Sequence, residues 1–286
     1  MTIRRVAVIG AGLMGAGIAQ VAASSGAAVD LCDTKQELLD AGKQRIEKSL
    51  SRFVKAGKLT EETKADIVSR IGYCLSLEAA VPEAEYVIEA VTERLDVKLS
   101  LFETLDRLAR PDVILSTNTS QLSVTHIASA TQRPERVIGT HFFNPPPMMN
   151  LIEIITAEQT SAETLDATLA LARQFGKETV VVKDSQGFVT SRVIYATILE
   201  AARCYQEGVA SKEDIDKACR LGLGFPMGPL ELVDLVGLDT FRNAMFGMVE
   251  AYGDRFNPPQ HFKKMVEAGK FGQKSGEGYY TYPRGK

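Results

Sequence analysis

The sequence has few of the residues that build metal and disulfide sites. It contains three histidines and four cysteines in 286 residues. The cysteines are Cys32, Cys74, Cys204 and Cys219, and none forms a C-x-x-C pair. This scatter argues against a zinc site or a disulfide framework and is typical of a reducing cytosol. We therefore expect a protein without a bound metal.

Long apolar runs and an excess charge of one sign are also absent. No apolar run approaches the length of a membrane span, and the opening MTIRRVAVIG enters a strand pattern at once, which leaves no room for a signal peptide. The formal net charge is −3, with 33 basic and 36 acidic residues interspersed. Such a balance gives no indication of binding to nucleic acid or to a membrane surface. The sequence predicts a soluble, cytoplasmic protein whose length is comfortable for two domains.

The first part of the chain alternates strand and helix patterns. Residues 6–9 are a short apolar run typical of a strand covered on both faces. A glycine-rich turn and a helix-like stretch follow, and Gly26 is a candidate helix C-cap. Further strand patterns are AAVDLCD, EYVIEAV, DVILSTN, ERVIGTHFF and TVVVKDSQG, and helices are expected at 36–55, 61–69 and near 96–108. The alternation predicts an α/β fold, a Rossmann-like doubly wound sheet over residues 1–184 with a helical excursion at about 36–70.

The remaining residues, 185–286, predict an all-α domain. Helices are expected at 188–206, 212–221, 228–236 and 238–252. The first, FVTSRVIYATILEAARCYQEG, is apolar on nearly every side, which is typical of a helix buried on more than one face. A domain of this size covers such a helix poorly, so we interpret it as partly buried by a second subunit of a homodimer. Burial against the sheet domain alone would give the same pattern.

A dinucleotide-binding fingerprint lies at the first turn. VAVIGAGLMGAGIAQ has the G-x-G-x-x-G spacing between a strand and a helix, and Asp33 follows 18 residues beyond the last glycine. An acid there hydrogen-bonds a ribose hydroxyl and repels a 2′-phosphate, so NAD is favoured over NADP, although Lys35 lies close by. The alternative is a structural turn with an unrelated aspartate. The cofactor-binding candidates here are Gly10, Gly12, Leu13, Met14, Gly15 and Asp33.

The stretch THFFNPPPMMNLIEII, residues 140–155, places an acid inside an apolar strand pattern. His141 and Glu153 lie symmetrically about Pro147, so an antiparallel hairpin around the proline loop would make them neighbours. A more distant arrangement stays open, because the loop is long. A buried glutamate needs a cationic or hydrogen-bonding partner, and a histidine that becomes charged during a reaction provides one. A structural salt bridge without chemistry is the alternative interpretation.

Six motifs together resemble the L-3-hydroxyacyl-CoA dehydrogenase family and look closest to the bacterial 3-hydroxybutyryl-CoA dehydrogenases. They are VAVIGAGLMGAGIAQ, EAVTERLDVK, STNTSQLSVTHIA, THFFNPPPMMNLIEII, GPLELVDLVGLD and GQKSGEGYY, and they span essentially the whole chain. The resemblance implies a Rossmann-like NAD domain, a helical dimerisation domain and a substrate cleft between them. It implies NAD-dependent, reversible oxidation of a short-chain 3-hydroxyacyl-CoA.

The resemblance also implies roles for single residues. His141 would be the general base, oriented by Glu153, with Ser120 at the substrate hydroxyl. The implied cofactor contacts are Glu93, Lys98, Asn118, Ser120, Asn144 and Lys274, of which Glu93, Lys98 and Lys274 could otherwise be ordinary surface charges. The implied CoA contacts are Ser49 and Lys55 on the lysine-rich helix, which could otherwise be a solvated face.

One position departs from the family pattern. Relatives read D-x-P-G-F-x-x-N-R where this chain reads DSQGFVTSR, so Ser191 occupies the place of an expected active-site asparagine. Ser191 could contact the substrate directly or through water, or the contact could be lost. Two further hypotheses stay open: a relative that acts on another 3-hydroxy compound (3-hydroxyadipyl-CoA, a sugar acid or carnitine), and a non-catalytic NAD-binding protein.

Overall fold

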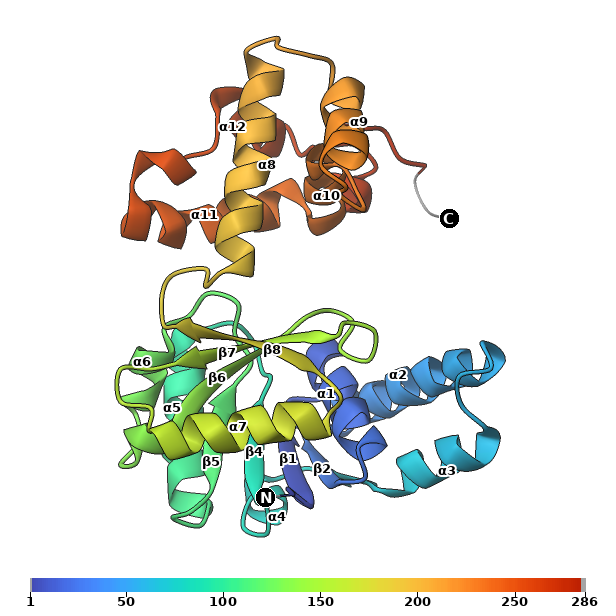
Figure 1. The fold of residues 1–286 in the computed structure, drawn as a ribbon, viewed down its shortest axis with the longest axis vertical. Coiled ribbons are helices and arrows are strands. Elements are labelled where there is room, and N and C mark those ends of the chain that lie inside the picture. The colour runs from blue at the N-terminus through green and yellow to red at the C-terminus, as the bar shows by residue number, and fades with distance from the viewer. Residues whose placement is uncertain (1, 284–286) are drawn as a thin grey trace. The chain divides into compact units, whose positions relative to one another are not determined.

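The computed structural model describes residues 2–283, and the chain divides into two compact units between Ser185 and Gln186 (Figure 1). The first unit is built on one eight-stranded sheet, and the second is helical. The predicted fold class, a Rossmann-like α/β sheet followed by an all-α region, is confirmed.

The sheet has the strand order β3-β2-β1-β4-β5-β6-β7-β8. Its strands are β1 (Arg5–Ile9), β2 (Ala28–Cys32), β3 (Ile71–Cys74), β4 (Tyr86–Glu89), β5 (Ile114–Thr117), β6 (Val137–Phe142), β7 (Leu151–Thr156) and β8 (Glu178–Lys183). Strands β1 to β6 run parallel, β7 is antiparallel to β6, and β8 is parallel to β7. The order of the first six strands reverses between β1 and β4, which is the place where doubly wound sheets bind ligands.

Helices cover the sheet and extend beyond it (Figure 1). They are α1 (Leu13–Ser24), α2 (Gln36–Lys55), α3 (Glu61–Ser69), α4 (Leu77–Ala80), α5 (Leu95–Leu108), α6 (Val124–Ala128) and α7 (Ala162–Gln174), with a short 3-10 helix at Pro134–Arg136. Helix α1 packs on β1 and β2, α7 packs on β6, β7 and β8, and α2 packs on α1. Helix α3 has a side-chain N-cap, because the Thr60 hydroxyl accepts a hydrogen bond from the Thr63 amide.

The second unit contains α8 (Thr190–Gln206), α9 (Lys212–Gly222), α10 (Pro229–Val236), α11 (Leu238–Tyr252) and α12 (Gln260–Glu267). Two 3-10 helices, Asp254–Phe256 and Gln273–Ser275, complete it. Its core includes Leu199, Leu230, Phe241, Met248 and Phe262. Helix α8 buries one face in this core, while Val193 on another face is 61% exposed.

Two buried aspartates in the second unit have structural partners. Asp216 accepts hydrogen bonds from the Leu230 and Glu231 amides, so its carboxylate caps the positive end of α10. Asp234 accepts the Tyr279 and Tyr280 amides and ties the last described segment to α10. Burial raises the pKa of the Asp234 carboxyl.

No helix among residues 2–283 has both the length and the apolar character needed to cross a lipid bilayer. In the same residues, no three His, Cys, Asp or Glu side chains come together as a potential metal site.

Candidate functional site

The glycine-rich turn joins β1 to α1 at the point where the strand order reverses. Gly10 has a φ of +104°, and a Cβ on Gly15 would lie 1.7 Å from the Gly10 carbonyl oxygen, so neither position accommodates a side chain. A Cβ on Gly12 would meet nothing within 4 Å. Helix α1 begins there with no side-chain cap and no acid in its first turn. This open, positive helix end suits a pyrophosphate.

Asp33 lies just beyond the carboxyl end of β2, beside this turn. Its Oδ2 accepts the Ala11 amide at 2.7 Å, and its Oδ1 accepts the Thr34 amide at 2.7 Å. The carboxylate is therefore held next to the glycine loop, where an adenosine ribose would lie in a Rossmann-like domain. Lys35 begins α2 as its N-cap residue.

His141 and Glu153 face each other across the β6–β7 hairpin. They are partners in the strand register, and the His141 Nδ1 lies 2.8 Å from the Glu153 Oε2. Glu153 is fully buried and His141 is 6% exposed. The other ring nitrogen, Nε2, lies 3.1 Å from the Ser120 hydroxyl oxygen. The neighbouring arrangement that the sequence allowed is thus the one present, and a Ser–His–Glu chain leads outward from the sheet.

Glu93 and Lys98 belong to a second chain of charges. The fully buried Lys98 ammonium lies 2.6 and 2.8 Å from the two oxygens of Glu89, which is also fully buried, and 3.6 Å from the Glu93 Oε2. The Glu93 Oε1 accepts the Thr119 hydroxyl at 2.5 Å and the Ser120 amide at 2.8 Å. The alternative that Lys98 is an ordinary surface charge is therefore wrong. The network fixes the backbone of Ser120, whose hydroxyl faces His141.

The two candidate asparagines flank β6. The Asn118 Oδ1 accepts the Phe142 amide at 2.9 Å, which joins the end of β5 to the end of β6. Asn144 is exposed and follows β6 directly, and its bond to Pro145 is cis. Both side chains lie on the segments that carry Ser120 and His141.

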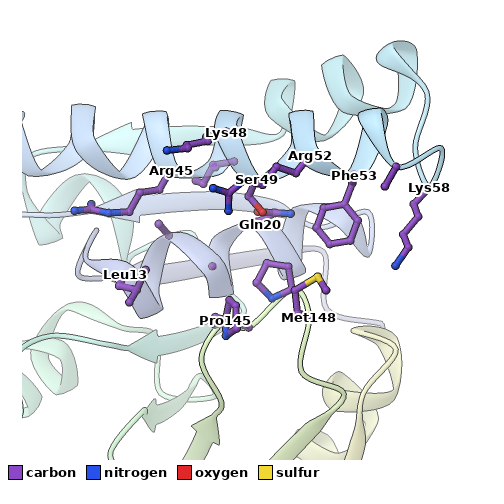
Figure 2. Close-up of a pocket in the computed structure, with 16 residues that line it drawn as sticks. Leu13, Gln20, Arg45, Lys48, Ser49, Arg52, Phe53, Lys58, Pro145 and Met148 are labelled. Atoms are coloured by element: carbon purple, nitrogen blue, oxygen red, sulfur yellow. The ribbon is translucent and has the colours of Figure 1, made fainter. Parts of the chain in front are cut away.

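A pocket of about 540 Å³ lies between α1, α2 and the loop of residues 143–150 that joins β6 to β7. Figure 2 shows Arg45, Ser49, Arg52 and Phe53 on α2, with Pro145 and Met148 of the loop across from them. The wall is mostly apolar, but it includes four cationic side chains. The lining residues are Leu13, Ala16, Gly17, Gln20, Arg45, Ile46, Lys48, Ser49, Arg52, Phe53, Ala56, Lys58, Pro145, Pro146, Pro147 and Met148. Ser49 is among them, whereas Lys55 is not; Lys58 lines the pocket instead.

Ser191 and Lys274 belong to the second unit. Ser191 is 9% exposed in the first turn of α8, three residues after Phe188, which has a positive φ, as does Gly187. Lys274 pairs with Asp239 at 2.6 Å and lies in the 3-10 helix after Gly272. The substrate contact of Ser191 and the cofactor contact of Lys274 stay predictions.

Two buried residues, Glu89 and Lys177, are not predicted as site residues by the sequence. Glu89 lies in YVIE, an acid within an apolar strand, which is the same signal that identified Glu153 in LIEII. Lys177 follows α7 in a segment without a pattern of its own, and its buried position became visible only in the structure. Three of the cationic pocket residues, Arg45, Lys48 and Arg52, are part of the predicted lysine-rich helix, and Lys58 follows its end. The sequence did not predict that they share a pocket.

Comparison with known protein families covers nearly the whole chain. Residues 5–185 match the 3-hydroxyacyl-CoA dehydrogenase NAD binding domain, and residues 187–282 match the 3-hydroxyacyl-CoA dehydrogenase C-terminal domain.

Individual relatives agree with these matches. The chain is 45% identical to the Bacillus subtilis protein named "Probable 3-hydroxybutyryl-CoA dehydrogenase", over 99% of this chain and 98% of the relative. It is 42% identical to the 3-hydroxybutyryl-CoA dehydrogenase of Clostridioides difficile, over 97% of this chain and 99% of the relative. The crystal structure of (S)-3-hydroxybutyryl-CoA dehydrogenase from Ralstonia eutropha superimposes with a TM-score of 0.96 at 40% identity, covering 99% and 100% of the two chains.

Proposed function

The chain belongs to the 3-hydroxyacyl-CoA dehydrogenase family, and from this premise we propose that it reversibly oxidises short-chain (S)-3-hydroxyacyl-CoA to 3-ketoacyl-CoA, with 3-hydroxybutyryl-CoA and acetoacetyl-CoA as the substrate pair. It is an NAD-dependent oxidoreductase of that family. The single observation that carries the chemistry is the buried Glu153–His141 pair with the Ser120 hydroxyl at its outer end.

The glycine turn and Asp33 fit the cofactor. The open end of α1 would hold the pyrophosphate, and the Asp33 carboxylate would hold the adenosine ribose. When bound, NAD would supply the nicotinamide that accepts the hydride leaving C3 of the substrate. Glu93, Asn118, Asn144 and Lys274 would provide further contacts. Lys98 is fully buried, so it would act on the cofactor site through Glu93.

His141 would move the proton that accompanies the hydride. An alcohol loses hydride readily only as its hydroxyl proton leaves, so a base must lie at that oxygen. With Nδ1–H donated to Glu153, the His141 Nε2 has a lone pair and can accept the proton; in the reverse direction it returns the proton to the keto oxygen. The Glu153 carboxylate stabilises the imidazolium, and Ser120 can hydrogen-bond the same oxygen.

The cationic pocket would bind the nucleotide part of CoA. Arg45, Lys48, Arg52 and Lys58 offer charge-assisted hydrogen bonds to phosphates, and the apolar wall suits an adenine ring. Ser49 would take part in these contacts. This pocket favours an acyl-CoA over a free hydroxy acid.

Kinetics with matched substrates test the proposal. NADH oxidation is followed in a spectrophotometer with acetoacetyl-CoA, longer 3-ketoacyl-CoAs and free acetoacetate, and each assay is repeated with NADPH. We expect turnover with acetoacetyl-CoA and NADH, with a decline for longer chains and for the free acid. Failure to reduce any acyl-CoA would favour another 3-hydroxy compound or a non-catalytic role.

The protein is also proposed to be a cytoplasmic homodimer. Its four cysteines, Cys32, Cys74, Cys204 and Cys219, are all free thiols, which agrees with a reducing compartment. The apolar side chains on the surface of the second unit support a subunit interface there.

A further inference from the structure

The loop between the His141 strand and the Glu153 strand, residues 143–150, is anchored on α1. We call it the proline loop. Pro146 is buried, and a Cβ on Gly17 would lie only 2.7 Å from the Pro146 Cδ, so the proline ring packs directly on the helix backbone. Met148 and Met149, in contrast, are 57% and 41% exposed.

Lys177 provides the second anchor. It lies between α7 and β8 and is 9% exposed. Its ammonium donates to the Pro146 carbonyl at 2.8 Å and to the Met149 carbonyl at 2.7 Å. Burial lowers the pKa of this lysine, since no carboxylate among residues 2–283 pairs with it to offset the lost hydration.

The composition of the loop explains why a buried lysine is useful there. Pro145, Pro146 and Pro147 have no N–H groups, so three successive residues cannot be held by donating backbone hydrogen bonds. The loop has two such bonds of its own, from the Met148 and Met149 amides to the Pro145 carbonyl. An ammonium has three N–H donors, so one lysine can bind two carbonyl groups of the loop, here those of Pro146 and Met149. Lys177 therefore supplies the donors that the prolines lack.

The proline loop forms one wall of the cationic pocket, through Pro145 to Met148 (Figure 2). The His141–Glu153 hairpin is held separately, by five paired positions between β6 and β7 and by pairing with β5 and β8. Loss of the Lys177 anchor should thus disturb the pocket wall while the hairpin keeps its register.

We propose that Lys177 is a positioning residue that determines thioester specificity: by holding the proline loop as a pocket wall, it creates the preference for CoA thioesters over thioesters without a nucleotide. This role rests on the proposed function, because it takes the pocket as the binding site of the CoA nucleotide. Lys177 itself touches neither the reacting atoms nor the pocket.

A pair of substrates with the same reacting group tests the role. The Lys177→Met variant is assayed with acetoacetyl-CoA and with the acetoacetyl thioester of N-acetylcysteamine, which lacks the nucleotide. We expect KM for acetoacetyl-CoA to rise about tenfold, with kcat and the kinetics of the short thioester nearly unchanged. Calorimetry with 3′-phosphoadenosine 5′-diphosphate should show a similar loss of affinity.

Lys183→Met is the matched control, because it removes the same charge from the exposed end of β8 and should leave the ratio of the two substrates unchanged. If Lys177→Met does not fold, Lys177→Gln, which keeps a donor but cannot reach both carbonyls, is expected to show the same selective loss. Equal losses with both thioesters, or no loss with either, would overturn the role of Lys177.

The unaltered protein separates the two proposals. If it reduces neither thioester, the proposed function fails and the role of Lys177 fails with it. If it is active but uses both thioesters equally well, the pocket does not bind the nucleotide. The assignment of the pocket and the role of Lys177 are then overturned, whereas the proposed oxidation of 3-hydroxyacyl thioesters stands.

Discussion

Glu89 is the last residue of β4, and Glu153 lies in β7 of the same sheet; both are fully buried, yet their partners differ. Glu89 faces the Lys98 ammonium and forms an ion pair with it, which joins β4 to α5. Glu153 faces a histidine, the side chain whose ordinary pKa lies closest to neutrality. The Glu153 pair can therefore take up and release a proton during a reaction.

Removal of either member of the His141–Glu153 pair should slow the reaction strongly. His141→Ala is expected to reduce kcat by about 10²- to 10⁴-fold, because the general base is lost. Glu153→Gln should also be slow, because a neutral amide cannot stabilise the imidazolium. NADH affinity, measured by fluorescence titration, should stay nearly unchanged in both variants. Near-normal turnover in either would remove the pair from the mechanism.

Substitution of Ser191 should have a smaller effect on the reaction than substitution of His141 or Glu153. Ser191 stands where the family pattern has an asparagine, and it is nearly buried in the first turn of α8. Ser191→Ala should lower kcat/KM about fivefold, the effect of one hydrogen bond of about 1 kcal/mol. Ser191→Asn should be tolerated. An unchanged kcat/KM in Ser191→Ala would show that this position contributes nothing to transition-state binding.

At the scale of elements, the sequence predicted those strands and helices whose pattern matches their burial. Strands β1, β4, β5 and β6 are almost continuous buried runs, and they were identified. The edge strand β3 was missed because its four residues, IGYC, are short and partly exposed. Helix α7 was missed because threonines, Thr164 and Thr168, occupy half of its buried face and weaken the apolar period.

The candidate site was predictable to a similar degree. The symmetry of His141 and Glu153 about Pro147 allowed their pairing, because hairpin register follows from spacing. The proline-loop anchor was not predictable, because Lys177 meets its carbonyl partners 28 and 31 residues away in sequence with no periodic pattern to indicate it.

The buried pair that joins β4 to α5 predicts a large effect on stability. Lys98→Met should lower the free energy of unfolding by about 3–5 kcal/mol, because Glu89 would remain buried without its cation. Burial already raises the pKa of the Glu89 carboxyl, and the Lys98 ammonium opposes that shift. The double variant Glu89→Gln/Lys98→Met should recover part of the loss in urea unfolding.

The exposed pair of Arg94 and Asp96 serves as the comparison. Its side chains are 65% and 66% exposed, so Arg94→Met should leave the midpoint of urea unfolding nearly unchanged. Equal losses in Arg94→Met and Lys98→Met, or simple additivity in the double variant, would contradict a coupled buried pair.

At the scale of the whole molecule, the two units differ in what their surfaces leave uncovered. The second unit exposes many large apolar side chains for its size: Val189, Val193, Tyr205, Val209, Leu221, Leu223, Leu235, Val236 and Phe246. Scattered apolar residues are ordinary on a surface, but a set of this extent on a unit of about 100 residues is typical of an interface. These exposed apolar side chains favour the expectation that a second subunit covers part of α8.

A homodimer should have twice the 31.1 kDa mass of one chain when measured by light scattering after size exclusion. Val193, 61% exposed on α8, is the position to change, because a lysine there would place a charge in the apolar contact. Val193→Lys should shift the protein toward the monomer at micromolar concentration. Ala268→Lys, at an exposed residue after α12, should leave the mass unchanged. If the unaltered protein is a monomer, or if Val193→Lys stays fully dimeric, this face of α8 does not form the subunit interface.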